Sequence, residues 1–118
     1  MNSKELAERL KCFAIRLVKV CAALPDSRIS KIIEGQLLRS SFSAAANYRA
    51  ACKAISKKAF VSKLSIAFEE ADETLFWIDV IADLQLITAI KIANVRQEAF
   101  ELSSILGAAR KTAQAQQK

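Results

Sequence analysis

The chain has no histidine, and its two glycines and one proline are few for 118 residues. Histidine is the commonest general base and the usual activator of a catalytic thiol, so its absence argues against both kinds of chemistry. No glycine-rich loop that could cradle a phosphate is present either. Scarce glycine and proline also argue against a disordered chain and against a β-rich fold with many turns. The sequence therefore points away from the common enzyme classes.

What is present favours helix. Hydrophobic residues make up 53% of the chain, and good helix formers such as Ala, Leu, Lys and Glu are abundant. A chain of 118 residues can bury a core without disulfides or metals. We therefore expect one all-α domain over residues 1–118.

The cysteines and the ends of the chain indicate a cytoplasmic protein. Cys12, Cys21 and Cys52 form an odd set without CxxC spacing, as expected of free thiols in a reducing compartment. The N-terminus is charged and amphipathic, unlike a signal peptide. The most apolar run, 80–95, contains Asp83 and is shorter than the ~20 residues that span a membrane. We expect a soluble protein without a membrane partner.

Apolar residues recur at steps of three and four, which predicts four helices packed as an antiparallel up-down-up-down four-helix bundle. The predicted helices cover about 3–24, 27–55, 57–82 and 89–113. Pro25 ends the first of them. The predicted N-caps are Asn2, Asp26 or Ser27, Ser56 and Thr88. The predicted core stripes are Leu6, Leu10, Phe13, Leu17, Val20, Cys21 and Leu24; Ile29, Ile33, Leu37, Ser40, Ala44, Tyr48, Ala51 and Ile55; Phe60, Leu64, Ala67, Ala71, Leu75, Ile78 and Ala82; and Val95, Ala99, Leu102, Ile105, Leu106 and Ala109.

Three details of the connections are also predicted. Ile55 and Phe60 match a hydrophobic staple around the Ser56 cap. The turn between the last two helices is placed at 83–87, although no glycine or proline is available to make it. The final residues, 112–118, lack apolar mass and are expected to fray.

The two middle helices each carry a second stripe that a solvated helix would not need. In the first of them the stripe is made of Ile32, Arg39, Ser43, Ala46 and Ala50, with Leu38 and Phe42 on a third side. In the next helix it is made of Ile66, Glu70, Glu73, Trp77 and Val80. Charge among bulky apolar groups is typical of an interface between chains. We therefore predict a homo-oligomer.

Residues 36–79 resemble a known family. The resemblance rests on Gln36-Leu37-Leu38-Arg39-Ser40, Ala46-Asn47-Tyr48-Arg49-Ala50, Ser56 followed by Phe60, Lys63-Leu64-Ser65-Ile66-Ala67, Glu70-Ala71 and Glu73-Thr74. These segments are similar to those of the four-helix bundle proteins, also called the 23S rRNA intervening-sequence proteins. The family's RSGTS-like run reads Arg39-Ser40-Ser41-Phe42-Ser43 in this chain.

The resemblance implies a small antiparallel bundle that forms a homopentameric ring. The family takes its name from genes inside intervening sequences of ribosomal RNA, and similar accessory proteins of diversity-generating retroelements bind nucleic acid. The polar positions that match the family are Arg39, Asn47, Glu70 and Glu73. We expect Arg39 to pair with Glu70 or Glu73, within or between subunits, and so to fix register. Together with Phe42, Ile66 and Trp77 these residues form the predicted oligomer interface.

Charge provides the second indication of function. The net charge is +6, and residues 56–86 are the only quarter of the chain in which acids outnumber bases. Basic side chains suit phosphate, although they can also be simply solvated. The candidate nucleic-acid contacts are Arg49, Lys53, Lys57 and Lys58 around the turn between the middle helices, and Lys4, Lys11 and Lys19 on the first helix. A ring would repeat the turn cluster around one end and gain avidity.

Sharper chemical interpretations have weaker support. Glu69, Asp72 and Glu73 share a face and could hold a hard cation. Di-metal bundles, however, supply Glu-x-x-His pairs, so acid on a solvent or subunit face is the preferred interpretation. Tyr48 and Trp77 could stack on bases, but their helical spacing favours packing. We predict no metal and no cofactor.

These observations lead to one predicted function and two alternatives. The prediction is a non-enzymatic, oligomeric accessory protein associated with ribosomal or retroelement-like nucleic acid. The first alternative is a protein-binding scaffold whose basic surface is incidental. The second is a metal-dependent nuclease, the one enzyme class that carboxylates alone could support.

Overall fold

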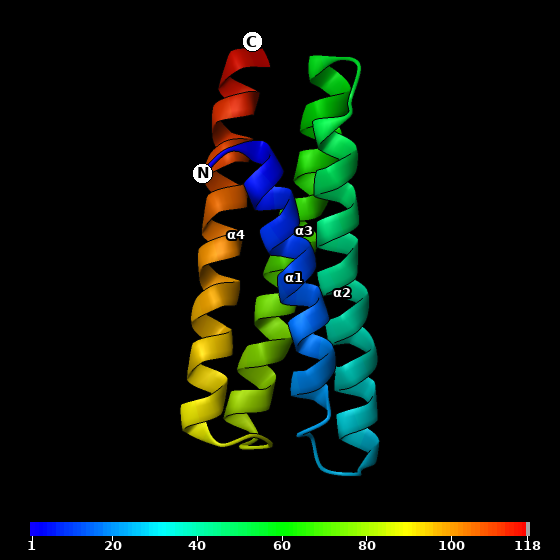
Figure 1. The fold of residues 1–118 in the computed structure, drawn as a ribbon, viewed down its shortest axis with the longest axis vertical. Helices are drawn as coiled ribbons and strands as arrows, with labels where there is room; N and C mark the ends of the chain where they lie inside the picture. The colour runs from blue at the N-terminus through cyan, green and yellow to red at the C-terminus, as the bar shows by residue number, and fades with distance from the viewer. Residues whose placement is uncertain (118) are drawn as a thin grey trace.

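The computed structural model describes residues 1–117 and contains four helices packed together, with no strand in that range. The helices are α1 (Ser3–Cys21), α2 (Arg28–Cys52), α3 (Lys57–Asp83) and α4 (Ala89–Gln117). They lie along one axis of a particle of 47 × 22 × 20 Å. Figure 1 shows the α2–α3 turn at the same end as the C-terminus and the start of α1, with the other two connections at the opposite end. No helix of the described range is long and apolar enough to cross a membrane.

Each of the first three helices begins at a side chain that caps it. The Asn2 side chain accepts a hydrogen bond from the Glu5 backbone N–H at 2.8 Å and donates one to the Glu5 carboxylate. Ser27 and Ser56 accept from the backbone N–H groups of Ser30 and Ala59. These contacts satisfy donors that a helix start would otherwise leave unpaired, and they fix where each helix begins.

The helix ends differ from the predictions by about one turn. α1 ends at Cys21 and α2 at Cys52, three residues earlier than expected. In both cases the next N–H groups bond three residues back rather than four, as in Ala22 to Lys19 and Lys53 to Ala50. This tighter turn satisfies the backbone but stops the α-helical ladder. At the other extreme, α4 continues to Gln117 with Ala113 buried, so residues 112–117 do not fray; Lys118 lies outside the described residues.

The predicted stripes of all four helices form most of the core. The largest fully buried side chains are Leu17, Ile33, Leu37, Leu64, Ile78, Ile81, Leu102 and Leu106. Two residues that were predicted to lie in the core, Ile29 and Ile55, are exposed instead. Ile29 is 42% exposed, and Ile55 is fully exposed because α2 stops before reaching it. The predicted staple between Ile55 and Phe60 is therefore absent.

The turn after α3 is made by ordinary residues, as expected. Gln85 takes a positive φ of 54°, a conformation that L-residues seldom adopt, and Ile87 and Ile92 are buried on either side of the start of α4. Burial of these two apolar side chains anchors the turn without a glycine.

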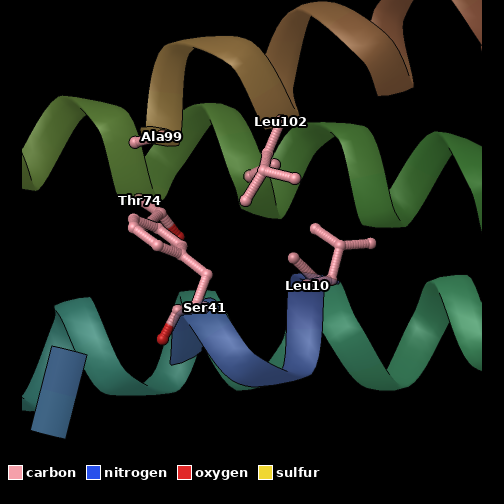
Figure 2. Close-up of a pocket in the computed structure, with 8 residues that line it drawn as sticks. Leu10, Ser41, Thr74, Ala99 and Leu102 are labelled. Carbon is pink, nitrogen blue, oxygen red and sulfur yellow. The ribbon is translucent and has the colours of Figure 1, made fainter. Parts of the chain in front are cut away.

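The centre of the bundle has no room for a ligand. Figure 2 shows the middle layer, where one side chain or more from every helix meets around a cavity of about 10 Å³. A cavity of this volume could hold one water molecule at most. Nearby, the buried Ser40 and Thr74 hydroxyls bond to each other at 2.8 Å and join α2 to α3. The larger hollows of residues 1–117 are lined mostly by exposed side chains at the surface.

Candidate functional site

Two long stretches of the chain contain no acidic residue. None occurs between Glu34 and Glu69, and none follows Glu101. The first stretch includes the second half of α2, the turn and the start of α3, and the second is the C-terminal half of α4. Both stretches contain basic residues, six in the first and three in the second.

The fold brings these two stretches together at one end of the bundle. The Lys57 ammonium donates to the Gln116 side chain at 3.0 Å, and the Arg110 guanidinium donates to the Ser65 hydroxyl at 3.1 Å. A Cβ on Gly107 would lie 2.9 Å from the Phe68 ring, so α4 approaches α3 closely here. We call the cations of this region the basic end. Its members are Arg49, Lys53, Lys57, Lys58, Lys63, Arg110 and Lys111.

Two of the predicted lysines of α1 adjoin this end and one does not. Lys4 and Lys11 line a surface groove together with Arg49 of α2. Lys19 lies in the last turn of α1, at the opposite end of the bundle in Figure 1. The fold thus groups six of the seven predicted cations and separates Lys19 from them.

Most of these grouped cations have no acidic partner. Among the described residues Lys11 pairs with Glu8 at 3.4 Å, whereas Lys4, Arg49, Lys53 and Lys58 make no ion pair. Lys57 and Lys58 also occupy the first turn of α3, where the helix dipole disfavours positive charge. An unneutralised cluster in an unfavourable position suits an anionic partner.

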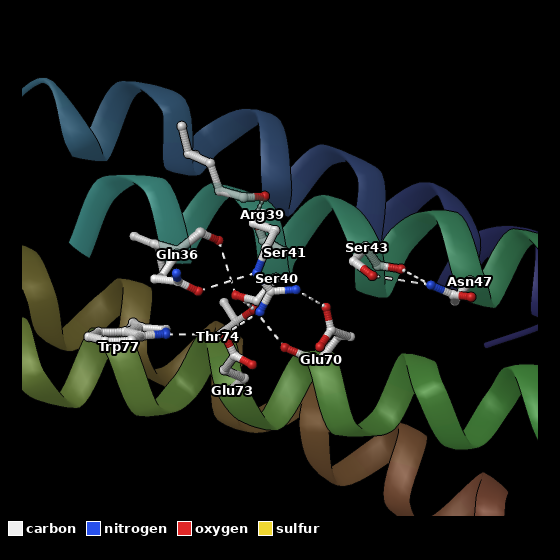
Figure 3. Close-up of polar contacts among 12 residues, drawn as sticks. Gln36, Arg39, Ser40, Ser41, Ser43, Asn47, Glu70, Glu73, Thr74 and Trp77 are labelled. Carbon is white, nitrogen blue, oxygen red and sulfur yellow. Dashed lines mark hydrogen bonds and ion pairs between the residues drawn. The ribbon is translucent and has the colours of Figure 1, made fainter. Parts of the chain in front are cut away.

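The second feature is a polar network across the outer face of α2 and α3, shown in Figure 3. The Arg39 guanidinium donates to Glu70 at 2.7 Å and also to Glu73, and its Nε donates to Gln36 at 3.2 Å. The Trp77 indole N–H donates to the same Glu73 carboxylate at 3.2 Å. The expected pairing of Arg39 is therefore present within one chain. The hydrogen bond to Glu73, followed in size of effect by the one to Glu70, raises the pKa of Arg39 above its usual value, so this residue stays charged.

The other predicted interface residues do not all lie beside this network. Asn47 donates to the Ser43 carbonyl at 2.9 Å, one turn back on α2. Ile66 is 38% exposed and Trp77 is half-buried. Phe42 is 41% exposed but lines the groove with Lys4 and Lys11, so it belongs to a different side of α2 from Arg39.

The ion pairs of Arg9 were not anticipated from the sequence. Arg9 of α1 donates through Nε to Glu98 of α4 at 2.9 Å and through Nη2 to Glu101 at 2.8 Å. These contacts join the first helix to the last, and the hydrogen bond from Arg9 lowers the pKa of Glu98. The i, i+3 spacing of Glu98 and Glu101 places both acids on one face of α4 and could have indicated a shared cation. The sequence does not identify that cation, because Arg9 is about 90 residues away.

Acidic and thiol side chains are the candidates for chemistry among the described residues. No group of three His, Cys, Asp or Glu side chains among them is placed to hold a metal ion. Burial raises the pKa of the Cys21 thiol to about 11, so it remains protonated and unreactive at neutral pH. What the surface offers is charge and exposed apolar area.

Comparisons with known proteins agree with this architecture. The family model of the 23S rRNA-intervening sequence proteins matches residues 4–108. A crystal structure of a protein of unknown function from the S23 ribosomal protein family of Bacteroides thetaiotaomicron VPI-5482 is similar, with a TM-score of 0.83 and 29% identity. The match covers 94% of this chain and 99% of that chain. No curated protein matches. The chain belongs to the 23S rRNA-intervening sequence protein family.

Proposed function

We propose that this protein is a non-enzymatic accessory protein of the cytoplasm that binds nucleic acid through its basic end. The observation that carries the proposal is the meeting of two acid-free stretches at one end of the bundle, where five lysines or arginines of the groove and turn have no ion pair among residues 1–117. The family name supports ribosomal RNA as the kind of partner. Phosphate contacts made by such cations supply affinity without requiring base recognition.

Assembly is the second part of the proposal. The four helices form an antiparallel up-down-up-down bundle, and several copies form a ring, five in the case that the resemblance implies. Support comes from the outer face of α2 and α3, where exposed Ile32 and Ile66 flank the Arg39 network. A ring would place the basic ends side by side, and repetition would strengthen weak phosphate contacts through avidity.

A salt titration tests the nucleic-acid proposal. Binding of a labelled RNA hairpin is measured by fluorescence anisotropy across a series of salt concentrations. Log affinity should fall linearly with log salt. A triple Lys53→Gln, Lys57→Gln, Lys58→Gln variant should reduce the slope by about 2 to 3, roughly 0.9 per lost contact.

The matched control changes the same amount of charge at the other end. The triple Lys19→Gln, Arg28→Gln, Lys91→Gln variant alters three exposed cations that form no ion pair in the described part of the chain. It should leave the slope nearly unchanged. Equal losses in both variants would mean that only net charge matters, and no binding at low salt would refute the proposal.

The alternative function is a protein-binding scaffold, favoured by the exposed apolar side chains. Phe76 and Phe100 are 55% and 48% exposed in a single chain, and aromatic side chains are enriched at protein–protein interfaces. Light scattering addresses this part directly. A 13.0 kDa chain would give about 65 kDa as a ring of five, whereas a monomer that binds no RNA would favour the scaffold.

A further inference from the structure

We infer that the groove between α1 and α2 binds a single-stranded segment of nucleic acid, with an unpaired base on Phe42 and phosphates on Lys4, Lys11 and Arg49. The inference rests on the proposed function and narrows it to one ligand class and one site. The groove has a volume of about 480 Å³. Its lining residues are Lys4, Ala7, Glu8 and Lys11 of α1, and Phe42, Ala45, Ala46 and Arg49 of α2.

The groove is built by the same spacing on both helices. Each helix contributes residues at i, i+3, i+4 and i+7, which lie on one helical face. Alanines occupy the middle positions on α2 and one middle position on α1, and their short side chains keep the space between the helices open. Long side chains stand at the ends, about 10.5 Å apart along each helix. The result is a hollow with charge at its rim and an apolar floor.

Three of the four groups at the rim are cations and the fourth is an aromatic ring. The connection between α1 and α2 lies at the lower end in Figure 1, so Lys4 shares one end of the groove with Arg49, and Lys11 shares the other end with Phe42. A ring flanked by cations is the combination that single-strand-binding proteins use, where bases stack on aromatic side chains and the backbone follows the positive charge. Phe has no hydrogen-bonding group, so this contact would tolerate any base.

The exposure of Phe42 decides between single-stranded and double-stranded ligands. Bases in a duplex are stacked inside the helix, and only an unpaired base can lie against a protein aromatic ring. A duplex could contact the lysines of the turn through its phosphates, but it could not use Phe42. The groove therefore gives a preference for single strands that the turn lysines alone would not provide.

Glu8 is the one lining residue that opposes this ligand. Its carboxylate lies 3.4 Å from the Lys11 ammonium and accepts a hydrogen bond from the Cys12 thiol at 3.7 Å. A phosphate near Lys11 would have to compete with that carboxylate. Removing the negative charge should therefore improve binding, a gain that damage to the fold would not produce.

The experiment compares a labelled ten-nucleotide oligouridylate with a blunt RNA duplex, both by fluorescence anisotropy at one salt concentration. Phe42→Ala should weaken oligouridylate binding by about fivefold to a hundredfold and leave duplex binding unchanged. Phe42→Trp should retain oligouridylate binding, and Glu8→Gln should tighten it by a few-fold. Thermal melts of each variant establish that the fold is intact.

Three results would overturn the inference. In the first, the Phe42→Ala variant binds oligouridylate with the affinity of the unaltered protein, whereas the triple variant of Lys53, Lys57 and Lys58 loses binding. This result would overturn the groove as the site but would leave the proposed function standing. The second is a change of mass in light scattering for Phe42→Ala, which would make the groove a contact between subunits. Loss of duplex binding equal to the loss of single-strand binding would also contradict it. Failure of the unaltered protein to bind any RNA would refute the proposed function itself.

Discussion

Arg39 and Arg49 lie on the same helix, about 15 Å apart along its axis, yet their surroundings are opposite. The Arg39 guanidinium contacts the Glu70 and Glu73 carboxylates, so its charge is neutralised within the chain. Arg49 lines a groove and makes no ion pair among the described residues. The difference arises from the side of α2 on which each arginine lies, because Arg39 faces the acids of α3 whereas Arg49 faces α1. The same residue type therefore serves structure at one position and is available for an anion at the other.

Of the changes that test the difference between Arg39 and Arg49, reversing the charge of Arg39 should have the largest effect on stability. Arg39→Glu removes two ion pairs and places three carboxylates together. Exposed pairs contribute up to ~1 kcal/mol each, so the loss in unfolding free energy should be about 2 kcal/mol, or roughly 8 °C in Tm at this size. Thermal melts at low and high salt measure this loss in the unassembled chain, whose RNA affinity should not change. An unaltered Tm would show that the network does not stabilise the chain.

A smaller effect, of a different kind, is expected at Arg49. Arg49→Glu should lower RNA affinity about tenfold, because it replaces a phosphate contact by a repulsive charge. Since its side chain is exposed and unpaired in residues 1–117, the Tm should remain within about 1 °C. A melt and an anisotropy titration on the same sample separate the two readouts. Equal behaviour of the Arg39 and Arg49 variants would remove the distinction drawn here.

The Arg9–Glu98 pair should make the free energy of unfolding depend on pH. Arg9 lowers the pKa of Glu98, so the pair stabilises the fold above the ordinary pKa of a glutamate. That contribution is lost as the pH falls through the lowered value. Glu98→Gln should cost about 1 kcal/mol at pH 7 and progressively less in acid. Denaturant titrations at pH 7 and at about pH 3 test the sign, and a difference that grew in acid would contradict it.

The smallest effect should come from Arg39→Lys. The charge is kept, but lysine has no planar fork to reach two carboxylates and Gln36 at once. We expect a loss of about 0.5 kcal/mol and no change in RNA binding. If a partner subunit covered this face, the cost would approach the 3–5 kcal/mol of a broken buried pair and would depend on protein concentration.

Local patterns predicted the helices and much of the core, because apolar spacing and caps act within a few residues. The family resemblance likewise placed Arg39 opposite the α3 acids. The failures have a common cause. Ile29 and Ile55 match the helical period. Whether such a side chain is buried, however, depends on where the helix ends and on which neighbouring helices cover it. Arg9 could not be paired with Glu98 because their contact depends on how α1 lies against α4.

The groove is a functional example of a feature that local sequence patterns could not predict. Lys4, Lys11, Phe42 and Arg49 were each singled out in the sequence, but for two different roles and on separate segments. Only the packing of α1 against α2 places them around one hollow. The separation of Lys19 also follows from packing, because charge alone does not say at which end of a bundle a residue lies.

Lysine footprinting tests the two-ended charge distribution most directly. The protein is acetylated with and without a labelled RNA hairpin, and the modification of each lysine is measured by mass spectrometry. Lys53 and Lys58 should be protected by RNA, whereas Lys19, Lys31 and Lys91 should react equally in both samples. Equal protection at both ends, or protection confined to Lys19, Lys31 and Lys91, would contradict the account.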